Sequence, residues 1–206
     1  DQYITANAAS NYMVFAAGNQ ERLRITSDGK IGINQTPTRE LSLHSPDNNN
    51  ALIHFTNDDT GETASDGILI GLNGNEDCIV NNQESGKNII FYTHNGSSVG
   101  ERLRITSDGK IGIGVENPSH FLHLKSASSP SIKLEDTTNT NILLMYAQDS
   151  DSHVGTYSNH PLVFDTNSTE RLRITPGGAV GINETAPSAM LHVENDNANA
   201  STYYLN

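Results

Sequence analysis

The sequence predicts an all-β protein, built as an elongated array of short-stranded β repeats. The block Glu-Arg-Leu-Arg-Ile-Thr-Ser-Asp-Gly-Lys-Ile-Gly-Ile-Gly at 101–114 occurs again, with few changes, at 21–34 and 170–183. Self-similarity of this kind is the signature of an array. Apolar residues make up only 34% of the 206-residue chain, tryptophan is absent, and Asn, Ser, Thr, Gly and Asp dominate between the apolar runs. This turn-rich composition, without any sustained helical spacing of apolar residues, favours β-structure throughout.

Each block predicts a β-hairpin. In the copy at 101–114, the arms 102–105 and 111–114 alternate apolar residues with arginine or glycine. Such alternation is the period of a strand. The Ser-Asp-Gly between the arms is typical of a tight turn. The three hairpins are therefore expected at 21–34, 101–114 and 170–183.

Two registers of the hairpin are compatible with this turn. A two-residue loop at Asp108-Gly109 would place the apolar residues of the two arms on opposite faces. A three-residue type I turn, with Gly109 in the left-handed region, pairs Ile105 with Ile111 and collects the apolar residues on one face. Burial favours this second register, since a slip by one residue reverses every side chain. The third copy agrees, because Pro176 takes the first turn position, where type I turns favour proline.

The second register also sets the arginines of each block opposite its strand glycines. A glycine weakens a strand unless another backbone or a long side chain must lie close to it. Two interpretations of the arginines remain open. They form a solvated face, with their aliphatic stems over the glycines, or they reach carboxylates of a neighbouring chain.

Short strands are expected around each block, at corresponding places. An apolar strand that ends in an aromatic residue precedes each block, and a proline turn with a second short strand follows it. The preceding strands are at 12–15, 88–92 and 161–164, and the following ones at 41–43, 122–124 and 191–193. Between blocks, 51–55 corresponds to 131–135, 67–72 to 141–146, and 78–80 to 153–155.

These correspondences divide the chain into four segments. Residues 1–40 form a partial repeat that contains the first hairpin, 41–121 a second repeat, 122–190 a third, and 191–206 the start of a further repeat or a terminal segment. A full unit contains six or seven short strands. Both ends of the sequence stand in mid-pattern, so we expect it to be a piece of something longer.

A single repeat contains too few apolar residues for a core of its own. Each strand offers two or three inward apolar side chains, at roughly 1.5–3 kcal/mol when fully buried. Ordering the backbone costs about 1–2 kcal/mol per residue, and half of each unit is polar loop. Several chains around a common axis would supply the missing neighbours and cover the strand edges. The sequence therefore predicts an obligate oligomer, with the chains either intertwined or side by side.

The block at 101–114, followed by Asn117-Pro118-Ser119 and Leu122-His123-Leu124, resembles the shaft repeat of tailed-bacteriophage tail fibres and related tail adhesins. This repeat often precedes a self-cleaving intramolecular chaperone domain, and the sequence leaves open whether such a domain belongs to this protein. The resemblance implies a homotrimeric fibre in the virion, outside the cell. It would project a receptor-binding region for attachment to the host.

Under this resemblance, the expected partners are further copies of the chain, other tail or baseplate proteins, and a glycan or protein receptor on the host surface. Two alternatives stay open, a tailspike-type polysaccharide depolymerase and a bacterial cell-surface or extracellular filament protein. The loops 57–66 and 137–141 are the expected exposed positions.

Charge and motifs narrow the function further. The net charge is −12, and half of the 12 cationic residues are the paired arginines of the blocks. Nucleic acid and anionic membranes need clustered cations, so neither is expected as a partner. No apolar run is long enough to span a bilayer, so no membrane insertion is expected. Nucleophile-elbow, phosphate-loop and zinc-helix motifs are missing. The expectation is a protein that is not an enzyme, with no catalytic residue and no cofactor.

Three features invite a metal or redox interpretation. His120 and His123 stand three apart, and His123 corresponds to His192, so that one histidine per chain around a threefold axis is a conceivable zinc site. Against this, His120 and His123 are expected on opposite faces of a strand. The acidic loops 57–62 and 149–152 lack the ordered calcium-loop pattern and are expected to be solvated turns. Cys78, the single cysteine, is expected to be a small buried strand residue.

Overall fold

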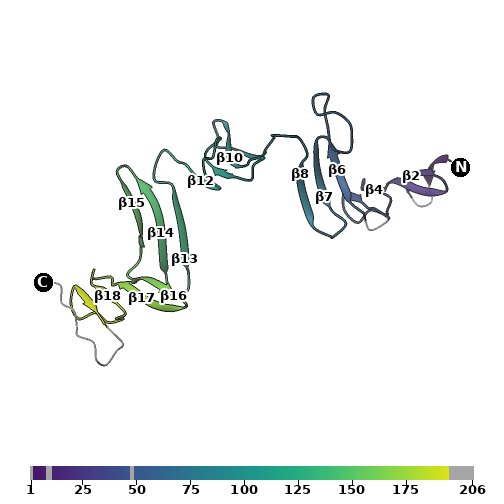
Figure 1. The fold of residues 1–206 in the computed structure, drawn as a ribbon. Helices are drawn as coiled ribbons and strands as arrows, with labels where there is room; N and C mark the ends of the chain where they lie inside the picture. The colour runs from purple at the N-terminus through teal and green to yellow at the C-terminus, as the bar shows by residue number, and fades with distance from the viewer. Residues whose placement is uncertain (1, 8–10, 47–48, 195–206) are drawn as a thin grey trace. The chain divides into compact units, whose positions relative to one another are not determined.

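In the computed structural model, which describes residues 2–7, 11–46 and 49–194, all regular structure is β-strand (Figure 1). The all-β prediction is confirmed, as is the scarcity of helix, since none of the described residues is helical. Accordingly, no helix in the described ranges is long and apolar enough to cross a membrane. The nineteen strands are β1 (Gln2–Asn7), β2 (Tyr12–Ala17), β3 (Gln20–Ile25), β4 (Ile31–Ile33), β5 (Leu41–Leu43), β6 (Ala51–Phe55), β7 (Ile68–Leu72), β8 (Cys78–Asn82), β9 (Ile89–His94), β10 (Val99–Ile105), β11 (Ile111–Ile113), β12 (Leu122–Leu124), β13 (Ser131–Asp136), β14 (Asn141–Gln148), β15 (Asp151–Thr156), β16 (Leu162–Thr166), β17 (Thr169–Ile174), β18 (Val180–Ile182) and β19 (Leu191–Val193).

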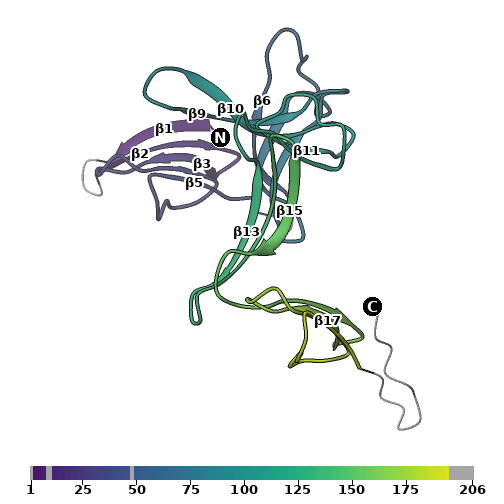
Figure 2. The same cartoon turned by 90° about the vertical axis from the view of Figure 1, so that its left-hand side faces the viewer.

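Two kinds of small sheet alternate along the chain. Figure 2 shows β1, β2, β3 and β5 of the first of them side by side. Three sheets contain the repeated blocks, with the strand orders β1-β2-β3-β4-β5, β9-β10-β11-β12 and β16-β17-β18-β19. We call them the hairpin sheets. Between them lie two three-stranded sheets, β6-β7-β8 and β13-β14-β15, in which each strand pairs antiparallel with the next. The predicted short strands at 41–43, 122–124 and 191–193 coincide with β5, β12 and β19.

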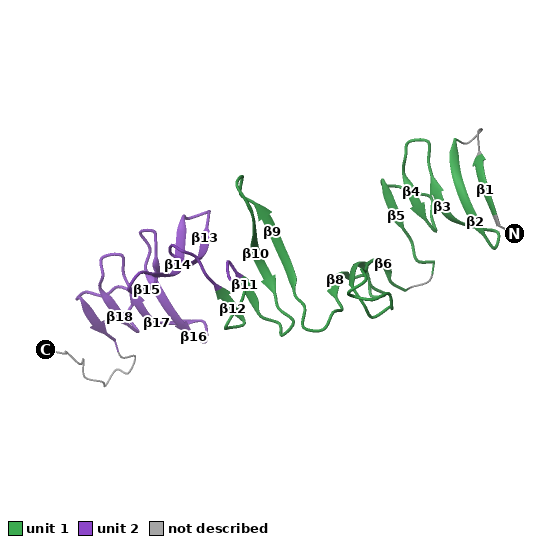
Figure 3. Cartoon of the chain, turned by 90° about the horizontal axis from the view of Figure 1, so that it is seen from above, with its two compact units in different colours: residues 1–112, 116–123 green, residues 113–115, 124–206 purple. Residues whose placement is uncertain are grey.

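The chain divides into two compact units, residues 1–112 with 116–123 and residues 113–115 with 124–206, which Figure 3 colours separately. Each hairpin sheet takes its last strand from the far side of a proline turn. That strand pairs parallel with the second arm of the hairpin, as Ile31 with Leu41 and Val180 with Leu191. Neither this parallel pairing nor β1 was predicted from the sequence.

The hairpin register is the predicted one. Leu23 pairs with Ile33, Arg24 with Gly32 and Ile25 with Ile31 in the first copy. The third copy has the same register, with Ile174 opposite Val180. In the second copy, the Thr106 N–H donates to the Lys110 carbonyl at 2.9 Å, as the corresponding residues do in the first. The apolar side chains of both arms therefore share one face.

The turn has the expected geometry. Gly29, Gly109 and Gly178 have φ between 81° and 86°, in the left-handed region that glycine adopts without strain. A hydrogen bond from each of these glycine N–H groups to the threonine carbonyl three residues earlier closes the turn. The type I turn followed by a left-handed residue gives the three-residue loop that this register needs.

The strand glycines lie beneath the proline turn. A Cβ on Gly32 would stand 2.2 Å from the Gln35 carbonyl oxygen and 2.8 Å from Pro37 Cδ. A Cβ on Gly181 would stand 2.2 Å from the Glu184 carbonyl oxygen. The alternation of Ile and Gly in the second arm thus has a steric cause. Glycine lets the backbone of the turn fold back onto the sheet, so that the parallel strand can join it.

Candidate functional site

Each hairpin sheet has two unlike faces. One, which we call the closed face, is partly covered by its own chain and carries the paired charges of the block. In the first sheet it holds the buried residues Gly32, Pro37 and Ser42, together with Val14 and Ala16. Apart from prolines, Val14 and Ala16, at 6% and 7% exposed, are the only apolar side chains that are buried among the described residues. The opposite, or open, face holds the apolar residues of the hairpin.

A glutamate–arginine pair braces the closed face in all three copies. Arg24, Arg104 and Arg173 each donate two hydrogen bonds to the glutamate three residues earlier, at 2.5–2.8 Å. The second pair is the most enclosed, with side chains 15% and 11% exposed for Arg104 and Glu101. These hydrogen bonds from arginine hold the pKa of Glu101 and of Glu170 below its usual range. The pairing is intrachain and bidentate, the strongest geometry for such a contact.

The interpretation as a solvated face is wrong for the second arginine of each block, which is half-buried and paired with a glutamate of its own strand. A contact of this arginine with a carboxylate of a neighbouring chain stays a hypothesis. A β-bulge beside the first arginine, visible as a register shift between Glu101 and Leu103, brings the glutamate onto the arginine's face. The first arginine, as at Arg102, is exposed and donates to Thr93 Oγ1 at 2.9 Å, as expected for a solvated face.

One position of the parallel strand fastens the proline turn in each copy. Ser42 Oγ accepts hydrogen bonds from the backbone N–H groups of Thr38 and Arg39, both at 3.3 Å. At the corresponding places, His123 Nδ1 accepts from the Ser119 N–H at 3.3 Å and His192 Nδ1 from the Ser188 N–H at 3.4 Å. The two histidines thus have a structural task that serine performs in the first copy.

The open face of each hairpin sheet exposes its apolar side chains. In the second sheet, Ile105 and Ile111 are each 37% exposed, Ile113 44% and Phe91 49%. The other two sheets repeat the pattern. Their exposed apolar residues on this face are Met13, Ile31, Ile33 and Leu41 in the first and Phe164, Ile174 and Leu191 in the third.

The two three-stranded sheets also have an apolar face. Cross-strand neighbours such as Ile53, Ile70 and Val80 share one side of the first of these sheets. Ile132, Met145 and Val154 do so in the second. All of these are 38–53% exposed. Apolar rows of this kind usually lie in a core, but among the described residues they stay largely exposed.

Cys78 belongs to this apolar face in the first three-stranded sheet, paired with Leu72. It is exposed, so the prediction of a buried strand residue is wrong in its burial and right about the strand. The error has a physical cause. The side of β8 that holds Cys78 is the side that its own chain leaves uncovered.

Among the described residues, neither the His120 and His123 pair nor the acidic loops belong to a group of three or more possible metal ligands. His120 precedes β12 and does not belong to it, so the expectation of opposite faces of one strand is wrong. Its ring contacts that of His123 edge-on, with centroids 6.5 Å apart. The acidic loops are turns. Asn57 Oδ1 accepts from the N–H groups of Asp59 and Thr60, and the stretch 149–152 includes the tight connection between β14 and β15.

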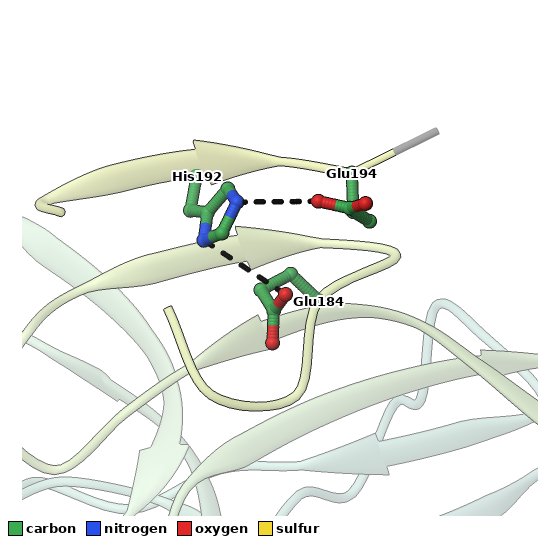
Figure 4. A group of neighbouring side chains, drawn as sticks. All are labelled: Glu184, His192 and Glu194. Atoms are coloured by element: carbon green, nitrogen blue, oxygen red, sulfur yellow. Dashed lines mark ion pairs between the residues drawn. The ribbon is translucent and has the colours of Figure 1, made fainter. Parts of the chain in front are cut away.

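One group of side chains, around His192, was not predicted from the sequence. Glu184, His192 and Glu194 offer ligand atoms that all lie within 4.8 Å of one another. Figure 4 shows the imidazole between the two carboxylates, one ring nitrogen facing each. Among the described residues, this is the only such group of three or more. Spacing alone hides it, because Glu184 comes from the turn after β18 and the other two come from β19 and its end.

The predicted loop positions are mostly exposed. Every residue of 137–141 is exposed, and so are most of 57–66, where Thr60, Gly61 and Asp66 are half-buried. Their contact with a receptor stays a prediction.

No protein-family model and no curated protein matches the chain.

Proposed function

We propose that this chain is a structural and adhesive shaft segment of a phage tail fibre, assembled as a homotrimer along the repeat direction. One observation carries the proposal. Every hairpin sheet pairs the charges of its closed face within the chain, and the described residues leave the apolar side chains of its open face exposed. The number three and the virion follow from the resemblance of the block at 101–114 to tail-fibre shaft repeats.

The open faces give the chain an energetic reason to bind further copies of itself. Burying one square ångström of apolar surface stabilises by roughly 25 cal/mol. Side chains such as Phe91, at 49% exposed, and Ile113, at 44%, forgo about half of that gain in the isolated chain. Identical chains that turn these faces toward a common axis recover it, and a symmetric assembly needs no second gene product. The repeats would then stack into a stiff shaft.

In the proposed assembly, some parts of the chain face the common axis and others face solvent. If the open faces turn inward, the closed faces and the loops 57–66 and 137–141 face solvent. Weak receptor contacts made by these loops would be multiplied over three chains. The partners are thus further copies of the chain, other tail or baseplate proteins, and a host surface glycan or protein.

Mass in solution and a glycan assay test the proposal. Sedimentation equilibrium should give three chains of 22.3 kDa. Incubation with capsular polysaccharide or lipopolysaccharide should release no new reducing ends. New ends would favour the depolymerase alternative. Electron microscopy of the parent particle separates a tail fibre from a bacterial surface filament.

A further inference from the structure

The third hairpin sheet differs from the other two at one place, beside the histidine that fastens its proline turn. At the position of His192 the first copy has Ser42 and the second His123, and both fasten the turn in the same manner. Only the third copy adds carboxylates. Where Glu194 stands, the second copy has Lys125, and where Glu184 stands it has Val115. The carboxylates are thus additional to the structural task that all three copies share.

The spacing of His192 and Glu194 fits one metal ion. His192 Nε2 lies 3.4 Å from Glu194 Oε2. Two donors bound to a tetrahedral zinc at about 2.0–2.2 Å stand roughly 3.3–3.6 Å apart. The two residues are two apart along a strand, so they project from the same face. The Glu194 N–H donates to the Ile182 carbonyl at 2.9 Å, which holds this end of the strand in the sheet.

Glu184 completes the arrangement from the other side of the ring. Its Oε2 lies 3.9 Å from His192 Nδ1, and its Oε1 accepts a hydrogen bond from the Ala186 N–H at 2.5 Å (Figure 4). Histidines that bind a metal through one nitrogen usually donate the other N–H to a carboxylate. The ion pairs of the described residues give neither glutamate an arginine or lysine partner. Two negatively charged carboxylates therefore face a single imidazole, and this excess of negative charge favours the binding of a cation.

We propose that this group is a Zn²⁺ site. His192 Nε2 and the Glu194 carboxylate are the protein ligands, water fills the remaining positions, and Glu184 is a positioning residue that accepts the Nδ1 proton. Zinc at Nε2 requires the tautomer that has its proton on Nδ1, so the ring proton would move from Nε2 to Nδ1 and Nε2 would supply its lone pair to zinc. Nδ1 would then donate to Glu184 in place of accepting from the Ser188 N–H. The site lies within one chain, so an assembly would hold one ion per chain. It adds a metal-binding function to one end of the shaft segment.

Isothermal titration of the purified full chain with ZnCl₂ tests the proposal. We expect one zinc per chain, and no comparable binding of Ca²⁺, which needs six or more oxygen ligands. The variant Glu194→Gln should weaken zinc binding by more than about 10-fold, and Glu184→Gln by a smaller factor, near the lower end of the 10–100-fold typical of supporting residues. Equal losses in the two variants would overturn the positioning role of Glu184.

His192→Ser is the decisive variant, because it copies Ser42 and should keep the turn fastened. We expect it to retain the circular dichroism spectrum and melting temperature while zinc binding is lost. His123→Ser, at the matched position of the second copy, should leave binding unchanged. Three results would overturn the proposal: no zinc binding, binding that survives His192→Ser, or one ion per three chains that is insensitive to Glu194→Gln. The last would indicate a shared axial histidine site.

Discussion

At the scale of single residues, the closed face shows how few side chains hold a hairpin sheet together. The bidentate glutamate–arginine pair and the side-chain acceptor on the parallel strand recur in all three copies, and the strand glycine lies close under the turn in the first and third. The pair and the acceptor satisfy charges and backbone donors, and the glycine makes room for the turn. Two predictions concern these residues.

The first prediction concerns pH. The pKa of Glu101 and of Glu170 is lowered by hydrogen bonds from arginine. A carboxylate with a lowered folded-state pKa contributes stability above its unfolded pKa, about 4.3, and loses it as pH falls through the folded value. The melting temperature at fixed chain concentration should therefore hold from pH 7 to about 5 and fall below about 4. The double variant Glu101→Gln/Glu170→Gln should melt lower at pH 7 and show a flatter acid limb. An acid limb as steep as that of the parent would contradict this account.

The second prediction concerns the strand glycine. Gly32→Ala places a methyl 2.2 Å from a backbone oxygen, so the turn must shift, at a cost of about 1–3 kcal/mol. Gly155, in β15, is the matched control, since a Cβ there meets nothing within 4 Å. Gly155→Ala should be neutral or slightly stabilising. Thermal unfolding of both variants at one chain concentration measures the difference, and equal stabilities would refute the steric role of Gly32.

At the scale of the element, the hairpin shows which parts of the fold could be predicted. The alternation in the arms and the Ser-Asp-Gly turn are local signals, and the register followed from requiring one apolar face. The residue type at the position after the second arm is another local signal. Asn34, Gly114 and Asn183 stand there, and all three have φ between 51° and 69°. Only residues that tolerate this conformation stand there.

Other features could not be predicted because they depend on distant residues. The parallel strand joins the sheet only because the glycine admits the proline turn, a contact across the fold. The glutamate reaches its arginine through a β-bulge, which shifts the alternation that sequence reasoning relies on. The Glu184–His192–Glu194 group needs both the turn and the parallel strand in place. Local sequence patterns do not encode contacts between residues that are distant in the sequence.

The third prediction tests the turn as an element. Ser27→Pro should stabilise the first hairpin by about 0.4–1 kcal/mol, since proline fits the first position of a type I turn and restricts the unfolded chain. The third copy already has Pro176 there. Ser107→Pro should gain less or lose stability, because the Ser107 N–H donates to Asn88 Oδ1 at 3.1 Å and proline removes this donor. Thermal melts of both variants provide the comparison, and the reverse order would contradict the turn assignment.

At the scale of the whole molecule, the proposed assembly depends on what covers the exposed apolar surface of the sheets. The described chain has no fully buried side chain of any size, although its apolar residues align in rows on every sheet. A protein that stood alone would gain little from such alignment. Copies that share these faces would turn the rows into a core, and Cys78 would then lie inside it.

The fourth prediction compares two substitutions on opposite faces of the same sheet. Ile113, 44% exposed, lies on the open face, and Val99, 65% exposed, pairs with His94 on the side of Glu101. In an isolated chain, glutamate at either place would cost little. In the proposed assembly, Ile113→Glu buries a charge and should dissociate or unfold the protein, whereas Val99→Glu should leave its mass unchanged. Equal tolerance of both substitutions would argue against a buried open face.

The mass of the folded protein in solution tests the central claim most directly. Sedimentation equilibrium over a range of concentrations, with circular dichroism to show that the β-structure is intact, should give three times the chain mass of 22.3 kDa. Loss of the trimer on dilution should coincide with loss of the β-structure. A well-folded, stable species of 22.3 kDa would contradict the account, because the open faces would then have no partner.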